Sequence, residues 1–282
     1  LKPDYIVACY DLPEPTHRHE AYEAYKAGRA KTDDNLVLQL ERSKDIFKAW
    51  GIPIYSEKGF EADDILGTIV EKLKKDKETE IIIASGDMDT LQLVDDKKVQ
   101  VYTLKKGIRD TILYDEKAVN TRFGFGPELL PDYKGLRGDP SDNIIGVKGI
   151  GEKTATSLIT TFGTVEKMYK ALKKNGEYKK AGINERVRDL LLANEEEALF
   201  SKTLATIRRD APIDFKLPKP WKESLVIENL IELFKELEFR TMGERVKMLI
   251  AKGSGKSDSV SGRINKNVDG FTISTGGSDT DR

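Results

Sequence analysis

The feature that most constrains this 282-residue sequence is an alternation of short β-branched runs with helical patterns in its first 115 residues. The runs YIVACY (5–10) and EIIIAS (80–85) are each followed within two residues by an aspartate. Such runs are typical of buried strands. A charged helical pattern (about 33–50), the segment IPIYS and a second helical pattern that begins at GFEADD lie between them. This order predicts an α/β fold with a mostly parallel central sheet flanked by helices.

Two further patterns refine this prediction. The helical stretch 33–50 spaces four apolar residues along one face: Leu36, Leu40, Ile46 and Phe47. The runs VQVYT (99–103) and TILY (111–114) predict two more strands. We expect these strands to form a hairpin that turns near Lys105, Lys106 and Gly107.

The pattern changes to helices alone after about residue 115, with frequent glycine interruptions. We therefore expect an α/β core over 1–115 and an all-helical lobe over 116–250. From 251 to 282 the sequence is rich in Gly and Ser, which is typical of a flexible linker. Such a linker predicts that further domains follow in a longer parent chain.

Composition limits the classes of function. The single cysteine, Cys9, excludes an intramolecular disulfide framework and favours a reducing, cytosolic setting. YIVACY, the longest apolar stretch near the start, is far shorter than the roughly 20 residues of a membrane span, so we expect no membrane partner. Lys and Arg number 47 against 48 Asp and Glu, and this near-neutral average argues against a nucleic-acid partner. Acids gathered in one site would, however, leave the rest of the surface basic. Whether the chain can bind nucleic acid therefore depends on the local distribution of charge and not on the average.

Acidic residues form four clusters at expected strand ends and helix starts, where the loops of an open α/β sheet bring distant residues together. Singly, such residues are usually turn formers or helix caps. Three carboxylates within four residues of GFEADD add a repulsion that capping does not explain. The eight candidates for one crevice are Asp11; Glu61, Asp63 and Asp64; Asp87 and Asp89; and Asp139 and Asp142.

The ligand types indicate the cation. Only two histidines are present, His17 and His19, and neither pairs with cysteine, so a zinc site is not expected. Carboxylate oxygens suit Mg²⁺ or Mn²⁺. Two such ions can activate water and stabilise the leaving oxygen in a phosphoryl displacement, so the clusters predict phosphodiester hydrolysis.

The segment GVKGIGEKTA (146–155) is a glycine-rich turn that opens a helix. It fits neither the mononucleotide P-loop nor the dinucleotide fingerprint. It is typical of a helix-hairpin-helix motif, whose free amides bind a DNA phosphate without reading bases. Simple packing of two helices about a turn is the alternative. The expected DNA contacts are Lys148, Gly149, Gly151, Lys153 and Thr154.

The segment THRHEAYEAYKAGRAK (16–31) mixes basic and aromatic residues. Such a mixture can clamp a nucleic-acid backbone and stack unpaired bases. A solvated helix face is the alternative. The candidates for DNA binding here are Arg18 and Tyr25, followed by Lys26 and Arg29.

Taken in order, the motifs YKAGR, FEADD, SGDMDTLQL and GDPSDNIIGVKGIGEKTA resemble the 5′-nuclease domain of bacterial DNA polymerase I, a relative of the flap endonucleases. The resemblance covers about residues 4 to 250 and implies a PIN-like fold. It implies that Asp11, Glu61, Asp63 and Asp64 serve one Mg²⁺ or Mn²⁺ ion. Asp87, Asp89, Asp139 and Asp142 would then serve a second.

The same resemblance implies a helical arch over about 16–50, from which Lys26 and Arg29 contact the scissile phosphate. The hairpin would grip duplex DNA with a bound K⁺ ion. Branched or 5′-flap duplex DNA would be the substrate of a monomer in the bacterial cytosol, joined to downstream polymerase domains in the parent chain.

One departure concerns the start of the chain. The family begins with an earlier strand that bears another metal-binding aspartate, and nothing before Asp4 supplies it. We therefore expect an N-terminally truncated fragment. Two alternatives stay open: a DNA-binding module with an incomplete metal site that does not cut, and a related RNA-cleaving nuclease.

Overall fold

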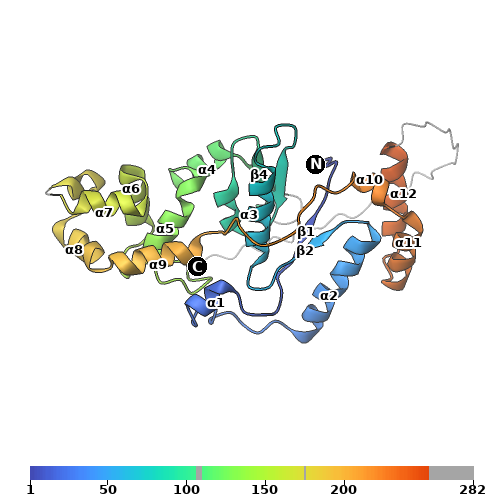
Figure 1. The fold of residues 1–282 in the computed structure, drawn as a ribbon, viewed down its shortest axis with the longest axis horizontal. Coiled ribbons are helices and arrows are strands. Elements are labelled where there is room, and N and C mark those ends of the chain that lie inside the picture. The colour runs from blue at the N-terminus through green and yellow to red at the C-terminus, as the bar shows by residue number, and fades with distance from the viewer. Residues whose placement is uncertain (106–109, 175, 254–282) are drawn as a thin grey trace, which may run out of the picture. The chain divides into compact units, whose positions relative to one another are not determined.

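The computed structural model of the chain describes residues 1–105, 110–174 and 176–253 (Figure 1). It divides into two compact units, Leu1–Leu230 and Ile231–Arg282. The first unit contains every candidate site residue named above. The stretch expected to be a linker lies, from residue 254 onward, outside the described residues.

The strands of the first unit are short and mostly parallel. β1 (Ala8–Cys9) pairs in parallel with β2 (Ile54–Tyr55). β3 (Ile81–Ala84) pairs in parallel with β4 (Val99–Leu104), and β4 pairs antiparallel with β5 (Thr111–Tyr114). This confirms the mixed α/β class, but the described strands form two small sheets where one was predicted. The expected hairpin joins β4 to β5, and positions 106 and 107 of its turn lie outside the described residues.

Local capping explains where the helices of this region begin. α3 (Ala62–Leu73) starts with a capping box in which Glu61 and Asp64 each accept from the other's backbone N–H. α2 (Asp34–Ala49) is capped by Asp33, whose side chain accepts from Asn35 N at 2.9 Å. The 3₁₀ helix η1 (Met88–Leu93) is capped in the same way by Asp87.

The arch region is less helical, and its longer helix less buried, than the sequence suggests. Helix in residues 16–50 is limited to α1 (His17–Ala21) and α2, with turns and extended backbone between them. No residue of α2 is fully buried, and Leu36 and Leu40 are about half exposed. α2 confirms the helix expected over about 33–50, and its apolar face is divided, because Ile46 and Phe47 are partly buried whereas Leu36 and Leu40 are exposed. Helical spacing fixes which residues share a face but not how much of that face is covered.

The remaining elements within the described residues are helical, as predicted. They are α4 (Glu116–Phe123), η2 (Pro127–Leu129), α5 (Leu130–Arg137), α6 (Glu152–Phe162), α7 (Val165–Leu172), η3 (Glu177–Ala181), α8 (Glu185–Ala193), α9 (Glu195–Ala205), α10 (Trp221–Ser224), α11 (Ile227–Glu236) and α12 (Met242–Gly253).

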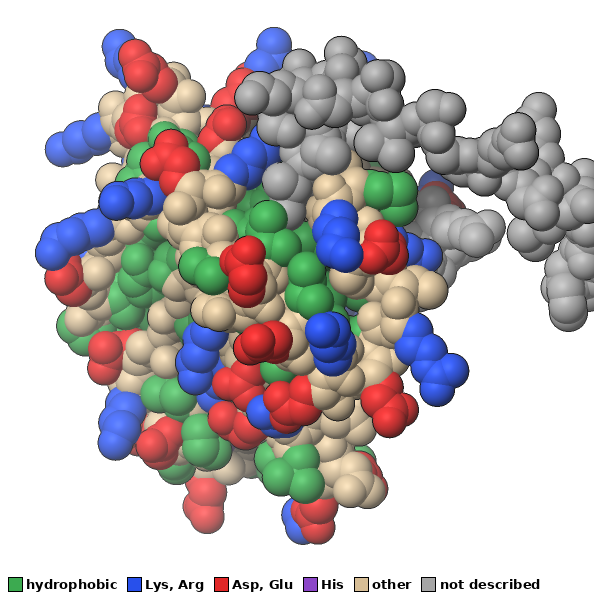
Figure 2. All heavy atoms as spheres, turned by 90° about the vertical axis from the view of Figure 1, so that its right-hand side faces the viewer, with side chains coloured by type: hydrophobic (Ala, Val, Ile, Leu, Met, Phe, Trp, Pro, Cys, Tyr) green, Lys and Arg blue, Asp and Glu red, His purple; other side chains and the backbone are tan. Residues whose placement is uncertain are grey.

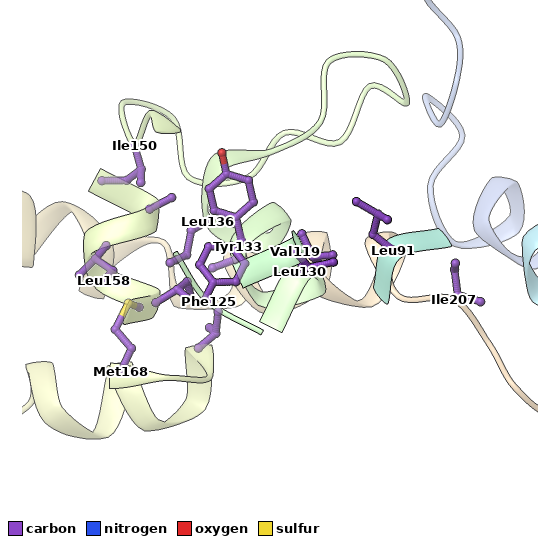
Figure 3. Close-up of a cluster of buried hydrophobic side chains, with 14 of the residues drawn as sticks. Leu91, Val119, Phe125, Leu130, Tyr133, Leu136, Ile150, Leu158, Met168 and Ile207 are labelled. Atoms are coloured by element: carbon purple, nitrogen blue, oxygen red, sulfur yellow. The ribbon is translucent and has the colours of Figure 1, made fainter. Parts of the chain in front are cut away.

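One hydrophobic core joins the helical lobe to the α/β part of the first unit. It runs from buried residues of β4 and η1 through α5 to α6 and α7. Figure 3 shows Leu136, Phe125 and Tyr133 beside one another within it, and the rings of Phe125 and Tyr133 lie 5.4 Å apart. α5 also packs against α9. This shared core fixes the loops of the helical lobe relative to α3 and η1.

The surface carries both charge signs. On the face shown in Figure 2, acidic and basic side chains lie interspersed. Among the residues that the structure describes, no helix has the length and apolar character needed to cross a membrane.

Candidate metal centre and nucleic-acid site

Five acids from three separate segments lie close together at the start of α3. Asp11 follows β1, and its carboxylate accepts a hydrogen bond from Ala62 N at 2.7 Å. Burial, followed by the negative charges of Asp87, Asp89, Glu61 and Asp11, raises the pKa of Asp63 to about 7. The expected convergence of these loops is therefore present in the fold.

A second group surrounds Lys134 in α5. The Lys134 ammonium binds the carboxylates of Asp89 and Asp139, the latter at 2.6 Å. Burial opposes its charge, but these two acids outweigh that effect and raise the pKa of Lys134. Asp139 also accepts from the backbone and hydroxyl of Ser141, at 2.9 and 2.6 Å. Lys134 thus links η1 to the loop after α5.

Tyr25 connects the last acid of the cluster to α3. Its ring is buried, and its hydroxyl lies 3.1 Å from Glu61 Oε2 and 3.0 Å from Asp142 Oδ2. Burial, followed by the charges of these two carboxylates, raises the pKa of Tyr25. Lys26 Nζ lies 2.6 Å from Glu61 Oε1, and an Arg29 Nη lies 2.6 Å from Asp142 Oδ1.

Backbone contacts hold the Lys26 segment against the Asp142 loop. Lys26 N donates to Asp142 O at 2.9 Å, and the Asn143 side chain donates to Ala24 O at 2.7 Å. Lys26 itself adopts a left-handed conformation with φ of 57°. A non-glycine residue keeps such a conformation only when its surroundings enforce it. These contacts set where Lys26 and Arg29 project.

Arg18 and Asp64 have surroundings that differ from the expected ones. Arg18 is 3% exposed and Asp64 is fully buried. The two form a bidentate ion pair with N–O distances of 2.8 Å. Burial alone would raise the pKa of Asp64, but the hydrogen bonds from Arg18 outweigh it and lower that pKa. The sequence suggested a DNA contact for Arg18 and a metal ligand in Asp64, whereas here each is the other's partner.

Three of the eight acids, Asp11, Asp63 and Asp87, have no Lys or Arg ion-pair partner within the described residues; the others pair with Arg18, Lys26, Arg29 or Lys134. In the same part of the chain, no group of three or more Asp, Glu, His or Cys side chains is arranged as a ready metal site. The donor chemistry nevertheless fits a hard divalent cation. A bound cation would reduce the electrostatic repulsion between Asp63 and the neighbouring acids once their side chains turned toward the cation.

The hairpin between α5 and α6 presents its polar residues to solvent. Lys148, Gly149, Gly151 and Lys153 are exposed and Thr154 is partly exposed, while the intervening Val147 and Ile150 are buried. Gly149 has φ of +97°, a conformation that favours glycine. Gly151 caps α6 without a side-chain hydrogen bond to the first turn. The geometry suits a backbone anion site at the start of α6.

Sequence reasoning missed Lys134. It lies 45 positions from Asp89, so no local motif pairs the two. The available signal was its place in α5, five residues before Asp139. A lysine ahead of an acidic loop is too common to be specific on its own.

Family models and known proteins match most of this chain. The family model for the 5′-3′ exonuclease N-terminal resolvase-like domain matches residues 1–124, and that for the 5′-3′ exonuclease C-terminal SAM fold matches 125–224. DNA polymerase I of Bacillus caldotenax is 39% identical over 245 residues, covering 87% of this chain and 27% of that protein. DNA polymerase I of Bacillus subtilis is 37% identical with the same coverage. The chain thus spans about a quarter of the length of these curated relatives.

A solved structure of bacteriophage T5 5′-exonuclease with bound divalent metal ions (zinc) matches with a TM-score of 0.60 and 22% identity, covering 82% of each chain. A complex of the T5 flap endonuclease with DNA and metal ions matches with a TM-score of 0.59 and the same identity and coverage. These likenesses show a common fold. The two family models, which together span residues 1–224, show that the chain belongs to the 5′-3′ exonuclease family.

Proposed function

We propose that this chain is a metal-dependent 5′-3′ exonuclease and flap endonuclease that hydrolyses DNA phosphodiester bonds during primer removal and repair. The observation that carries the proposal is the crowding of acids from separate loops around Asp63, which raises the pKa of its carboxyl to about 7. Crowded carboxylates either share protons or bind cations. The T5 nuclease structures that match this fold hold metal ions, and one also holds DNA.

Seven acids are the proposed metal ligands. Asp11, Glu61 and Asp63 would serve one ion, and Asp87, Asp89, Asp139 and Asp142 the other. When bound, two Mg²⁺ or Mn²⁺ ions would activate water and neutralise negative charge on the oxygens of the scissile phosphate. Asp64, which the sequence placed in the first group, would instead act through the residues that it orders.

Lys26 and Arg29 would bind the scissile phosphate. Both lie at the acidic cluster, and the Arg29 side chain is about half exposed. A phosphate that entered the site would compete with Glu61 and Asp142 for these two cations, because charge-assisted hydrogen bonds to phosphate are strong. Transfer of the two side chains to phosphate would free the carboxylates for metal and oppose the negative charge of the transition state.

The hairpin would hold the duplex beside the cleavage point. Phosphates would be contacted by Lys148, Lys153, Thr154 and the backbone at Gly149 and Gly151. The turn would also bind a K⁺ ion. Such contacts position DNA without reading its sequence. The substrate would be branched or 5′-flap duplex DNA. We place the chain in a longer DNA polymerase I, acting as a monomer in the bacterial cytosol.

The test is cleavage of a 5′-flap duplex in Mg²⁺ by wild type and by Asp63→Asn. Loss of a residue that only supports a metal ligand typically lowers activity by ~10–100-fold. Because Asp63 is itself a proposed ligand, we expect the variant to lose at least about 100-fold in cleavage rate. Asp214→Asn is the matched control, because Asp214 is exposed and pairs only with Lys216 among the described residues. Undiminished cleavage by Asp63→Asn would refute the site.

A DNA-binding module that does not cut is the second candidate. It is favoured by the ion pairs that neutralise five of the eight acids and by the absence of a ready metal site among the described residues. Tight binding of the flap duplex in EDTA, with no turnover after Mg²⁺ is added, would support this candidate over the nuclease.

A further inference from the structure

Arg18 uses all five of its N–H donors inside the protein. Nε donates to Leu204 O at 2.9 Å. One terminal nitrogen donates to Asp64 Oδ2 at 2.8 Å and Glu61 Oε2 at 3.2 Å. The other donates to Asp64 Oδ1 at 2.8 Å and Thr206 O at 2.9 Å. A guanidinium has five donors, so none is left for an external ligand.

Two of these partners, Leu204 O and Thr206 O, belong to one segment of the chain. We call residues 204–211 the return segment; it contains the end of α9 and the chain that runs back along α3 and η1. Its backbone is held by further buried side chains. Asp64 accepts from Arg208 N at 2.8 Å, Thr68 accepts from Ala211 N at 3.0 Å, and Gln92 binds Ala205 O and Ile207 N at 3.1 and 2.9 Å.

Within the described residues, Glu61 is the proposed metal ligand that hydrogen-bonds directly to Arg18. Its Oε2 lies within hydrogen-bond distance of the Arg18 guanidinium and the Tyr25 hydroxyl, whereas its Oε1 accepts from the Lys26 ammonium. Lys26 is the mobile partner in the proposed reaction. Arg18 is buried and immobilised by the return segment, so it can hold the Glu61 carboxylate in place when Lys26 moves to phosphate.

We infer that Arg18 is a positioning residue that fixes Glu61 in the metal centre and ties it to the return segment of the helical lobe. It is not a DNA contact. To reach a phosphate, its charge would have to leave Asp64, which would remain buried without a counter-ion at high cost. The inference rests on the proposed function, because Glu61 matters here as a metal ligand.

The test is the double variant Arg18→Met/Asp64→Asn, which removes both members of the buried pair and so avoids an uncompensated charge. Thermal melting, Mn²⁺ binding by calorimetry and binding of a flap duplex in EDTA are measured. We expect a cooperative melt, Mn²⁺ binding at least about tenfold weaker, and duplex affinity within about twofold of wild type. Arg245→Met, which removes an exposed guanidinium from α12, is the control for loss of positive charge.

Two results would overturn the inference. Weaker duplex binding with unchanged Mn²⁺ affinity would make Arg18 a DNA contact, and unchanged values of both would make it a structural residue alone. If the double variant does not melt cooperatively, Arg18→Lys undergoes the same measurements, since lysine keeps the charge beside Asp64 but cannot make five directed hydrogen bonds. Wild type that binds Mn²⁺ and cleaves the flap keeps the proposed function intact in either case; wild type that binds no Mn²⁺ defeats both.

Discussion

At the scale of single residues, the site is an assembly of charges whose states depend on their neighbours. Asp63 and Asp64 are adjacent in sequence, yet the pKa of Asp63 is raised and that of Asp64 is lowered. The difference lies in the partner, because Asp64 binds Arg18 whereas Asp63 faces other acids. Two adjacent carboxylates on one helix turn therefore differ in role: Asp64 stabilises the fold through its ion pair, whereas Asp63 is repelled by the acids around it.

The raised pKa of Asp63 predicts a pH effect on stability in the absence of metal. The folded-state pKa of about 7 exceeds the ordinary value of 3.8. The folded state therefore retains the proton that the unfolded chain loses, and the stabilisation present at low pH disappears as the pH rises from about 4 to about 7. Asp63→Asn should consequently be more stable than wild type by roughly 2 kcal/mol at pH 8 and by much less at pH 5.

Urea unfolding in EDTA at the two pH values measures this difference, with Asp214→Asn as the control. An equal difference between Asp63→Asn and wild type at pH 5 and pH 8 would contradict it, because it would mean that the Asp63 carboxyl is not perturbed.

At the scale of elements, α3 is the helix on which the site depends. Its first turn carries Glu61, Asp63 and Asp64, and Asp11 binds its free amide at Ala62. One turn further on, Gly67 allows the return segment to lie directly against the helix backbone. A Cβ at Gly67 would fall 2.7 Å from both Arg208 O and Ile207 Cγ2.

We predict that Gly67→Ala destabilises the protein by about 1–3 kcal/mol, although alanine ordinarily favours a helix interior. The added methyl group would push the return segment away from Asp64 and Thr68. Gly243→Ala is the matched helical control, because nothing lies within 4 Å of a Cβ at that position, and we expect it to be neutral or slightly stabilising. Urea unfolding measures both; a Gly67→Ala variant as stable as wild type would show that the segment adjusts freely.

At the scale of the first unit, one loop carries both acids of the proposed metal centre and the hairpin. Asp139 and Asp142 lie in the loop that leaves α5, and the hairpin begins at Gly146 in the same loop. Val147 N donates to Leu136 O at 2.9 Å, which fixes the hairpin to α5. Because α5 also belongs to the main core, duplex binding and cleavage would occur at a set separation.

The two activities should nevertheless respond separately to substitution. Lys148→Ala/Lys153→Ala should weaken binding of duplex DNA in EDTA and reduce the slope of log affinity against log salt by about 2, one for each lost phosphate contact. Mn²⁺ binding by the same variant should equal that of wild type, since neither lysine touches an acid of the cluster in the described structure. An unchanged salt slope would remove the hairpin from the DNA interface.

Sequence patterns spanning a few residues were sufficient to predict much of the local structure of this molecule. The helix that begins at GFEADD, the strand runs that precede Asp11 and Asp87, and the glycine turn at 146–151 were all predicted, because each depends on neighbours in the chain. The α/β class with an appended helical lobe followed from their order. The apolar spacing predicted the helix α2 for the same reason, but such spacing carries no information about what packs against the helix.

The sequence by itself determined which residues would stand at loop ends and helix starts, and hence that acids would converge. Only the tertiary structure decided which acids remained exposed to one another and which gained a buried cation. Arg18 meets Asp64 across 46 positions, and Lys134 meets Asp89 across 45. Such pairs depend on the packing of whole elements, because a charge buried in a protein is stable only where the complete fold supplies its partner.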